Sequence, residues 1–308
     1  MTKTSALRMT PVEWGLLLIL SVLWGGAFFL IEIALRDLPP FTIMILRVAG
    51  ASLFLWTIVI IRGAAFPRGV GLWVVLTIMA VFNSALPFSL IAWGQVQIPS
   101  GLSSILIAMT PLFAVVSAHF FTEDEAFTPM KGLGLASGLV GAVVLIGPEF
   151  LRDIGVNLFA QLAVLGGAIS YSIAAVFGRR FGRRDISQIS VAAGQVSMAV
   201  VLLLPFVLIF DRPWTLEMPS VSGIGAVAGL ALGSTGIAYL IYYRILASAG
   251  ATNLMLVNFL APVSALILGI FVLGEVLTTT QAIGMAFIAL GLALIDGRLF
   301  QRQGAKDG

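Results

Sequence analysis

GPEFLRDIGVN (residues 147–157) is a short polar break in a sequence that is otherwise apolar almost throughout, and it decides how the chain is organised. Five long apolar segments precede the break and five follow it. Because each set is odd in number, a second set that resembles the first would cross a membrane in the opposite direction. The break therefore predicts two five-helix repeats of opposite orientation, at 13–148 and 158–298, and a cytoplasmic tail at 299–308.

The composition predicts a membrane protein. Of the 308 residues, 59% are hydrophobic and only 10% are charged, and the mean hydropathy is +1.08. A soluble domain of this size needs more charge on its surface. The segments are long enough to span a bilayer as helices, and they lack the alternating polarity of a β-barrel. We predict an all-α integral membrane protein with ten transmembrane helices, at 13–35, 41–61, 71–93, 99–121, 131–147, 158–178, 187–210, 221–243, 250–273 and 279–297.

The first segment is predicted to be a retained helix rather than a signal peptide, because charged residues and not small ones follow it. Basic residues then predict the orientation. With a cytoplasmic N-terminus, thirteen basic residues fall in inside loops and three in outside loops, which is the bias expected of cytoplasmic loops. Both chain termini are therefore expected in the cytoplasm. The thirteen are Lys3, Arg8, Arg62, Arg68, Lys131, Arg179, Arg180, Arg183, Arg184, Arg244, Arg298, Arg302 and Lys306, and the three are Arg36, Arg152 and Arg212.

The net charge of +3 follows from this bias and gives no indication of nucleic-acid binding. The chain has no cysteine, which excludes disulfides and thiolate metal sites. No metal site and no cofactor are predicted.

The two halves match at a nearly constant spacing. Pro111 and Pro262 are 151 residues apart, and the polar pair Asn83–Ser84 meets Ser234–Thr235 at the same offset. Further matches are Phe88 with Tyr239, Asp124 with Glu275, Gly134 with Gly284, Gly141 with Gly291, and Trp24 with Tyr171. Each match is weak, but their order along about 130 residues indicates an internal repeat.

Several of these positions carry a resemblance to a known family. Trp24-Gly25, then Arg47, and in the second half Pro262 with Glu275 thirteen residues later and a glycine-rich last helix, resemble the EamA domain. Two such domains in tandem resemble the drug/metabolite transporter superfamily, and the chain is most similar there to YddG-type exporters of aromatic amino acids. The resemblance covers residues 13 to about 297. The first half departs from the pattern, because the acidic run Glu123–Glu125 stands where the second half has Gly274-Glu275.

Polar and aromatic residues in mid-segment are the candidates for a binding site. Uncharged donors and acceptors beside aromatic rings suit a small solute with a polar head and an apolar side chain. Each serine or threonine has an alternative interpretation, in which its hydroxyl bonds to its own helix. The candidate substrate-binding residues are Trp24, Asn83, Ser84, Ser170, Tyr171, Ser234, Thr235, Tyr239, Tyr242 and Asn258.

Two prolines and two charged residues have other predicted roles. Pro111 and Pro262 each remove a helix hydrogen bond, which frees the carbonyl of Ile107 in the first case, and they are either paired hinges or static kinks. Glu32 and Arg47 enter from the same side and are expected to pair. The pair would be an outer gate, with Arg47 available to a substrate carboxylate, or a buried ion pair that fixes packing.

The sequence favours a secondary transporter of the bacterial cytoplasmic (inner) membrane. It would export small amphipathic metabolites, aromatic or large apolar amino acids above all, by alternating access between the repeats. Other metabolites or drugs, including nucleobases, sugars and cationic compounds, are the alternative. An enzyme or a channel is a distant alternative, because catalytic motifs and rings of charge are missing from the sequence. The expected partners are a small-molecule substrate and the lipid bilayer, and the sequence does not decide between a monomer and an oligomer.

Overall fold

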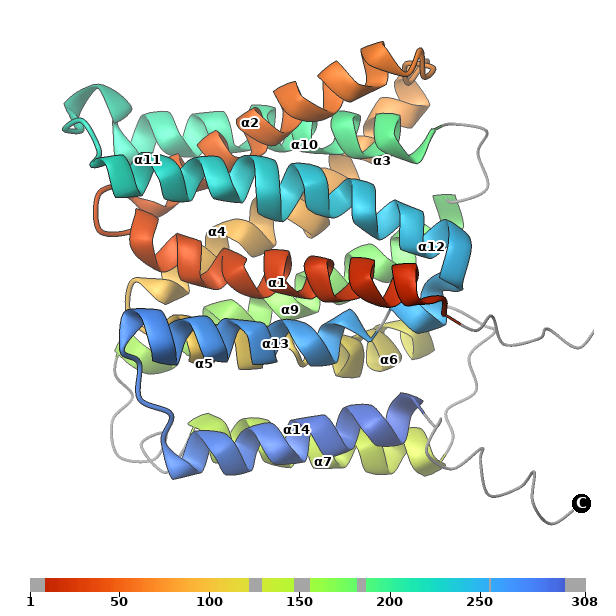
Figure 1. The fold of residues 1–308 in the computed structure, drawn as a ribbon, viewed down its shortest axis with the longest axis vertical. Helices are drawn as coiled ribbons and strands as arrows, with labels where there is room; N and C mark the ends of the chain where they lie inside the picture. Colours follow the sequence, from red (N-terminus) through yellow and green to blue (C-terminus); the bar gives the residue numbers. More distant parts are fainter. Residues whose placement is uncertain (1–8, 122–128, 147–155, 182–186, 255, 297–308) are drawn as a thin grey trace, which may run out of the picture.

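The computed structural model of the chain describes residues 9–121, 129–146, 156–181, 187–254 and 256–296, and within these ranges it contains helices and no strand. The first half holds α1 (Pro11–Ala34), α2 (Pro40–Ile61), α3 (Val70–Ala80), η1 (Val81–Ala85), α4 (Leu86–Gln95), α5 (Ser100–Ile107), α6 (Thr110–Phe121) and α7 (Pro129–Ile146). The second half holds α9 (Val156–Phe181), α10 (Gln188–Phe206), η2 (Val207–Asp211), η3 (Pro213–Thr215), α11 (Val221–Ala228), η4 (Gly229–Ile237), α12 (Ala238–Leu254), α13 (Val257–Leu268), η5 (Gly269–Leu273) and α14 (Thr279–Asp296). The helices run side by side along one direction (Figure 1).

The described residues form an all-helical protein that can cross a membrane many times. Seven continuous helical stretches are long and apolar enough to span a bilayer, and three shorter apolar helices accompany them, at Gly132–Gly141, Leu260–Leu273 and Thr279–Leu294. The three shorter helices coincide with the fifth, ninth and tenth predicted segments. The predicted membrane character of the fold is thus confirmed.

Two predicted segments have different boundaries in the structure. The segment predicted at 99–121 is two helices, α5 and α6, which are separated by Ala108 and Met109. The segment predicted to end at 243 instead continues as α12 to Leu254, and the next helix, α13, begins at Val257. The loop predicted between 243 and 250 was therefore wrong. Its residues are compatible with a helix, and polarity alone did not mark where the chain turns.

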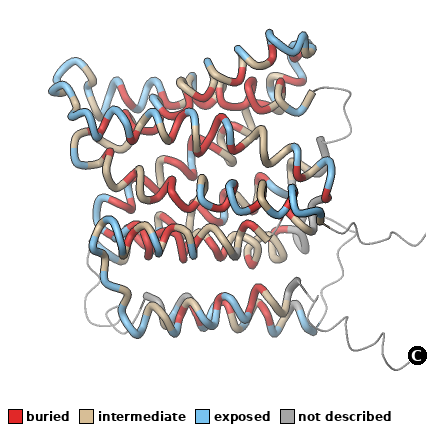
Figure 2. Tube along the Cα trace, in the orientation of Figure 1, coloured by how far each residue is buried: buried red, intermediate tan, exposed pale blue. Residues whose placement is uncertain are grey.

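Pairs of helices from opposite halves form the body of the fold. The helix α1 packs against α13 and α12, α4 packs against α9, α2 packs against α10 and η4, and α7 packs against α14. The α7–α14 pair forms the lowest layer in Figure 1, below α5, α6 and α13. In Figure 2 the buried positions concentrate where the layers meet, and exposed positions line the outer surfaces of the bundle.

Glycines allow the closest of these approaches. A methyl group on Gly25 of α1 would collide with the carbonyl oxygen of Ala261 and would lie 2.8 Å from Cβ of Ser264, both on α13. The α7–α14 crossing is reciprocal. A methyl group on Gly141 would lie 2.7 Å from the carbonyl oxygen of Gly284, and one on Gly291 would lie 2.5 Å from that of Gly134. Backbones meet at these points, as is common where membrane helices pack through small residues.

Three carboxylates cap helices of the other half at one end of the bundle. This is the end where α1 finishes and α5 and α11 begin, on the left in Figure 1. Asp37 accepts from the backbone and side chain of Ser220 at the start of α11. Asp211 accepts from the backbone N–H of Thr42 near the start of α2 at 2.6 Å, and from its hydroxyl. Glu275 accepts from the backbone of Ser100 and Gly101 at 2.8 and 3.0 Å, and from the Ser100 hydroxyl, at the start of α5. We call this end, defined by Asp37, Asp211 and Glu275, the carboxylate end.

Replacing Glu275 with glutamine is expected to destabilise the protein by about 1–2 kcal/mol. The amide lacks the negative charge that favours a helix N-terminus, and its nitrogen cannot accept from the Gly101 N–H. The measurement is thermal unfolding in detergent. The matched control is Glu217→Gln, which changes an exposed acid in the loop before α11. Equal effects of the two substitutions would contradict a capping role for Glu275.

Candidate functional site

The two polar pairs found in the sequence lie in π-helical segments of matching position. Asn83 and Ser84 lie in η1, between α3 and α4, and Ser234 and Thr235 lie in η4, between α11 and α12. Adding 151 to the numbers of η1 gives 232–236, which falls inside η4. A π-helical turn interrupts the regular ladder of backbone bonds and is frequent at functional sites. Each half thus presents its polar pair from an irregular helical turn in the interior.

Arg47 of α2 contacts the second of these segments, η4. It is 6% exposed, although it is seven residues into α2 and therefore about 10 Å from the start of that helix. Its Nε donates to the Thr235 hydroxyl at 2.9 Å. Its guanidinium carbon lies 3.9 Å from the centre of the Phe88 ring, in a cation–π arrangement. Helix α2 thus places one cation between η4 and α4.

The guanidinium of Arg47 has N–H donors beyond the one that bonds to Thr235. Among the described residues, the side-chain hydrogen bond of Arg47 uses only Nε, which leaves the N–H groups of both Nη atoms for another partner. A buried guanidinium with free N–H groups is suited to bind a carboxylate through two parallel hydrogen bonds.

A second set of polar contacts mirrors the first. Gln195 of α10 donates to the Ser84 hydroxyl at 3.0 Å, and it lies 3.5 Å from the Tyr239 hydroxyl. The Asn83 amide lies 3.4 Å from the same hydroxyl. Because Ser84 and Thr235 match at the repeat offset, the Gln195–Ser84 bond corresponds to the Arg47–Thr235 bond. We call Arg47, Asn83, Ser84, Gln195, Thr235 and Tyr239 the polar cluster.

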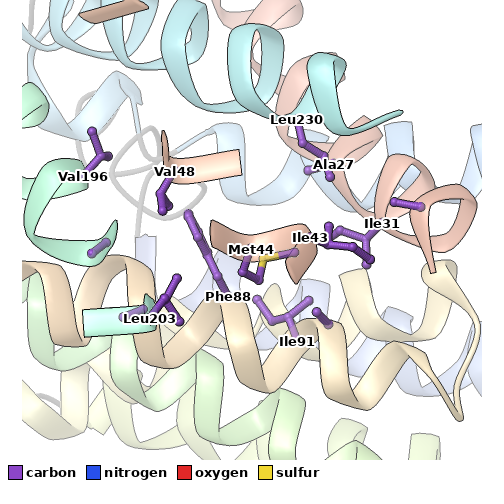
Figure 3. Close-up of a cluster of buried hydrophobic side chains, with 14 of the residues drawn as sticks. Ala27, Ile31, Ile43, Met44, Val48, Phe88, Ile91, Val196, Leu203 and Leu230 are labelled. Carbon is purple, nitrogen blue, oxygen red and sulfur yellow. The ribbon is translucent and has the colours of Figure 1, made fainter. Parts of the chain in front are cut away.

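Aromatic rings extend from the polar cluster in two directions. Phe88 is buried and lies with Met44 and Val48 in the largest apolar core (Figure 3). Its ring meets Tyr171 of α9 edge-on, at 6.5 Å between centroids. On the other side, Tyr239 contacts Tyr243, and Tyr243 contacts Tyr242. Tyr242 in turn lies 5.7 Å from Trp24 of α1. Polar groups and rings are therefore continuous from α9 to α1.

The structure brings most of the candidate residues together. Asn83, Ser84, Thr235 and Tyr239 lie in the polar cluster, and Tyr171, Tyr242 and Trp24 join it through the ring contacts. Ser234 is buried beside Thr235. Ser170 donates to the backbone carbonyl of Phe82 at 2.7 Å, which ties α9 to η1. Asn258 is half-buried on α13. Whether these residues contact a substrate stays a prediction.

The predicted pair between Glu32 and Arg47 is not formed between these two described side chains. Arg47 reaches Thr235 and Phe88 instead, and Glu32 interacts with Gln95. The prediction considered only how deep each residue lies along its helix. The direction in which a side chain points around the helix axis depends on packing, which the sequence does not display.

The two prolines differ in their surroundings. The break between α5 and α6, at Ala108 and Met109, comes two residues before Pro111. The hydroxyl of Thr110 donates at 2.7 Å to the carbonyl of Ile107, which Pro111 leaves without its helix partner. Pro262 lies inside the continuous helix α13 and is buried. The acidic run Glu123–Glu125 lies outside the described residues.

Sequence reasoning missed Gln195. Its signal was present, because the repeat offset carries Arg47 close to position 195, in the second helix of the second half. A glutamine in an apolar segment, aligned with an arginine that had been selected, should have been a candidate. Among the described residues no group of three or more His, Cys, Asp or Glu side chains forms that could hold a metal ion.

Comparisons with known proteins agree with this arrangement. A family model described as the EamA-like transporter family matches twice, at residues 13–147 and 158–296. The chain is 27% identical to the uncharacterized transporter YoaV of Bacillus subtilis over 92% of its length and 96% of the relative's. It is 28% identical to the uncharacterized inner membrane transporter YedA of Escherichia coli K12, over 92% and 90% respectively. A solved crystal structure shares the fold, with a TM-score of 0.67, 22% identity and coverage of 96% of this chain and 99% of that chain.

Proposed function

Because this chain belongs to the EamA-like transporter family, we propose that it is a secondary transporter that exports small amphipathic metabolites, aromatic and large apolar amino acids above all. One observation carries the choice of substrate. A buried arginine with free Nη groups lies against a ring and within a continuous set of tyrosines and a tryptophan. An α-carboxylate would bind the guanidinium, and an apolar or aromatic side chain would lie among the rings.

The same observation argues against the other substrate classes. Arg47 would repel a cationic compound, and a buried charge left without a counter-ion would oppose the binding of a neutral sugar. The amide and hydroxyl groups of Asn83, Gln195 and Tyr239 can accept hydrogen bonds from an α-ammonium group. The cluster therefore offers a donor for the carboxylate, acceptors for the ammonium group and rings for the side chain.

The fold that we propose is a pair of five-helix repeats of opposite orientation, ten transmembrane helices in all. Each contact between the halves has a counterpart when the two repeats are exchanged. The contact of α1 with α13 corresponds to that of α9 with α6, and the contact of α1 with α12 corresponds to that of α9 with α4. The α2–α10 pair and the α7–α14 pair each join the same helix of the two repeats, so exchange of the repeats leaves each pair unchanged. The reciprocal contacts of Gly141 and Gly291 in the α7–α14 pair fit this symmetry. The polar cluster draws on both halves, as expected of a transporter with its site between repeats.

Orientation follows from the charge bias in the loops. We place both chain termini in the cytoplasm and the carboxylate end outside, in a bacterial inner membrane. The start of α1 and the end of α14 lie at the same end of the bundle, opposite the carboxylate end (Figure 1), and a relative of this chain is named as an inner membrane transporter. Alternating access would then open the cluster to one side at a time.

Bending at Pro111 and Pro262 is the proposed means of this exchange. Replacing both with alanine removes the ring that keeps each helix from forming a continuous set of backbone hydrogen bonds, and is expected to slow transport about tenfold while substrate affinity stays unchanged. Transport would be measured as counterflow in proteoliposomes and affinity by calorimetry. The control is Pro205→Ala, since Pro205 also lies inside a helix, α10, away from the matched pair. An equal slowing in the control, or a loss of affinity, would contradict the hinge role.

The function is tested by uptake of radiolabelled tryptophan into proteoliposomes of the purified protein. We expect saturable uptake that phenylalanine, tyrosine and leucine inhibit. Tryptamine, which lacks the carboxylate, is expected to inhibit far less. Uptake that nucleobases or sugars block equally well, or no uptake by protein shown to be folded, would refute the substrate assignment and leave the family and fold unaffected.

A further inference from the structure

Arg47 and Gln195 occupy the same place in the two halves of the chain. Arg47 lies seven residues after the first residue of α2, and Gln195 lies seven residues after the first residue of α10. Both side chains are buried, with 6% and 3% exposed. The helices that carry them are the second long helices of their halves, and they pack against each other. The two residues are therefore candidates for equivalent roles in one site.

The side chain of Arg47 contacts one residue from each half. It donates to the Thr235 hydroxyl of η4 at 2.9 Å, and its guanidinium carbon lies 3.9 Å from the centre of the Phe88 ring in α4. We call these three residues the first half-site. A bare aromatic ring suits a guanidinium, because the attraction of a cation to the face of a ring needs no hydrogen-bond acceptor.

Gln195 makes the matching contacts on the other side. It donates to the Ser84 hydroxyl of η1 at 3.0 Å, and its amide nitrogen lies 3.5 Å from the Tyr239 hydroxyl in α12. We call these three residues the second half-site. Ser84 and Tyr239 each match a member of the first half-site at the offset of 151 residues. The two half-sites thus have the same layout, with an amide in place of the guanidinium and a phenol in place of the bare ring.

The second half-site carries no charge and offers oxygen acceptors. The amide nitrogen of Gln195 is directed to Ser84 and Tyr239, which leaves its Oε1 for another partner. The amide nitrogen of Asn83 lies 3.4 Å from the same Tyr239 hydroxyl, which leaves the Asn83 Oδ1 as well. Amide oxygens accept hydrogen bonds, and an ammonium group donates up to three. The second half-site therefore suits a cationic group, whereas the first suits an anionic one.

We propose that Gln195 is a specificity-determining residue and that the two half-sites are interchangeable. Arg47 takes the carboxylate of the substrate, and the uncharged second half-site takes its ammonium group. A guanidinium at position 195, with a glutamine at position 47, would bind the carboxylate in the second half-site instead. The substrate would then be bound the other way round. The assignment of substrate groups to half-sites rests on the proposed function, whereas the interchange of the side chains does not.

Exchange of the half-sites preserves the handedness of the site. The proposed repeats are related by a rotation about an axis in the membrane plane. A rotation does not convert a chiral molecule into its mirror image, so an L-amino acid turned by the same rotation meets equivalent contacts. Exchange of two side chains, without redesign of the rest of the cluster, is therefore expected to be sufficient.

The first test needs no substrate. Arg47→Gln combined with Gln195→Arg, the exchanged variant, is expected to unfold in detergent within about 2 °C of the parent protein. Gln195→Arg alone is expected to lower the unfolding temperature by about 4 °C or more, because two guanidinium groups then repel each other in one buried cluster. Adding Arg47→Gln should remove that loss.

A matched control tests whether the exact position on α10 matters. The offset of 151 residues would carry Arg47 to Met198, one turn beyond Gln195, and Met198 packs against the largest apolar core. Arg47→Gln combined with Met198→Arg moves the guanidinium into that apolar setting and should unfold at least about 4 °C below the exchanged variant. The proposal is overturned if the exchanged variant unfolds no later than this control, or if it yields no folded protein.

Uptake of tryptophan then tests which half-site takes the carboxylate. Gln195→Arg, added to Arg47→Gln, is expected to raise the uptake that Arg47→Gln leaves by about tenfold or more, because the guanidinium again pairs with the carboxylate. A glutamine that only fills space predicts no recovery. Lack of recovery in an exchanged variant that unfolds like the parent overturns the assignment of the substrate groups. If the parent protein takes up no tryptophan, the proposed function fails, and the unfolding temperatures still decide whether the half-sites are interchangeable.

Discussion

Arg47→Gln is expected to reduce kcat/KM for tryptophan about 100-fold or more. A charge-assisted pair in a buried site contributes about 2–5 kcal/mol on removal of one partner, and 2.7 kcal/mol corresponds to a factor of about 100. Glutamine retains much of the length of arginine but loses its charge and the fork of parallel N–H groups. The measurement is initial uptake into proteoliposomes over a range of tryptophan concentrations.

Two further substitutions separate charge from geometry. Arg47→Lys keeps the charge but cannot form two parallel bonds to a carboxylate, so we expect a loss of about tenfold. Thr235→Val removes the hydroxyl that holds Nε of Arg47 at 2.9 Å. Losing a hydrogen bond to a charged group costs about 1.5–3 kcal/mol, so the valine variant should show weaker binding and lower thermal stability.

Substrate analogues supply the control. Tryptamine lacks the carboxylate, so its weak inhibition of uptake should be unaffected by Arg47→Gln. If instead Arg47→Gln transports tryptophan normally while remaining folded, the guanidinium has only a structural role. If Arg47→Gln weakens the inhibition of uptake by unlabelled tryptophan and by tryptamine to the same extent, the carboxylate is not the group that Arg47 recognises.

Gly25 is the position where a small substitution is expected to do the most structural harm. Gly25→Ala would place a methyl group against the backbone of α13, and neither backbone can move without separating α1 from α13. Overpacking of this kind costs about 1–3 kcal/mol. Gly25→Leu is expected to yield no protein that is monodisperse by size-exclusion chromatography. The alanine variant is checked by its thermal unfolding temperature.

The same helix provides a matched control. Gly15, also in α1, has no atom within 4 Å of the position that a methyl group would take. Gly15→Ala should therefore be neutral, or stabilising by up to about 1 kcal/mol because alanine favours the helix. A loss of stability at Gly15 equal to that at Gly25 would show that helix packing is not the cause.

Much of this architecture could be predicted from the sequence, because helices that cross a membrane have a distinctive amino-acid composition. Continuous apolar runs indicate helices, since every backbone group must be bonded inside a bilayer. The repeat offset selected Asn83, Ser84, Thr235 and Tyr239, and the structure brings these together. The Glu275 motif was visible as a pattern, but its capping of α5 was not, because that contact joins residues 175 positions apart.

What the sequence could not supply was the rotation of each helix about its axis. Glu32 lies about 3 Å from the end of α1 and Arg47 about 10 Å from the start of α2, and Arg47 bonds to Thr235 rather than to Glu32. The end of α12 was also hidden, because residues 244–249 are compatible with a helix and no proline or charge run marks the turn. Gln195 was recoverable only through comparison with Arg47 in the other half.

The π-helical turns η1 and η4 also bear on how this chain tolerates changes in length. A π turn contains about one residue more than an α turn. Deleting one residue within either segment would leave an ordinary α-helix, with the flanking parts still facing their original neighbours. Elsewhere in the same helices a one-residue deletion rotates everything beyond it by about 100°. Within these two helices, the segments that hold Ser84 and Thr235 are therefore the places where loss of a single residue can remove the site and spare the fold.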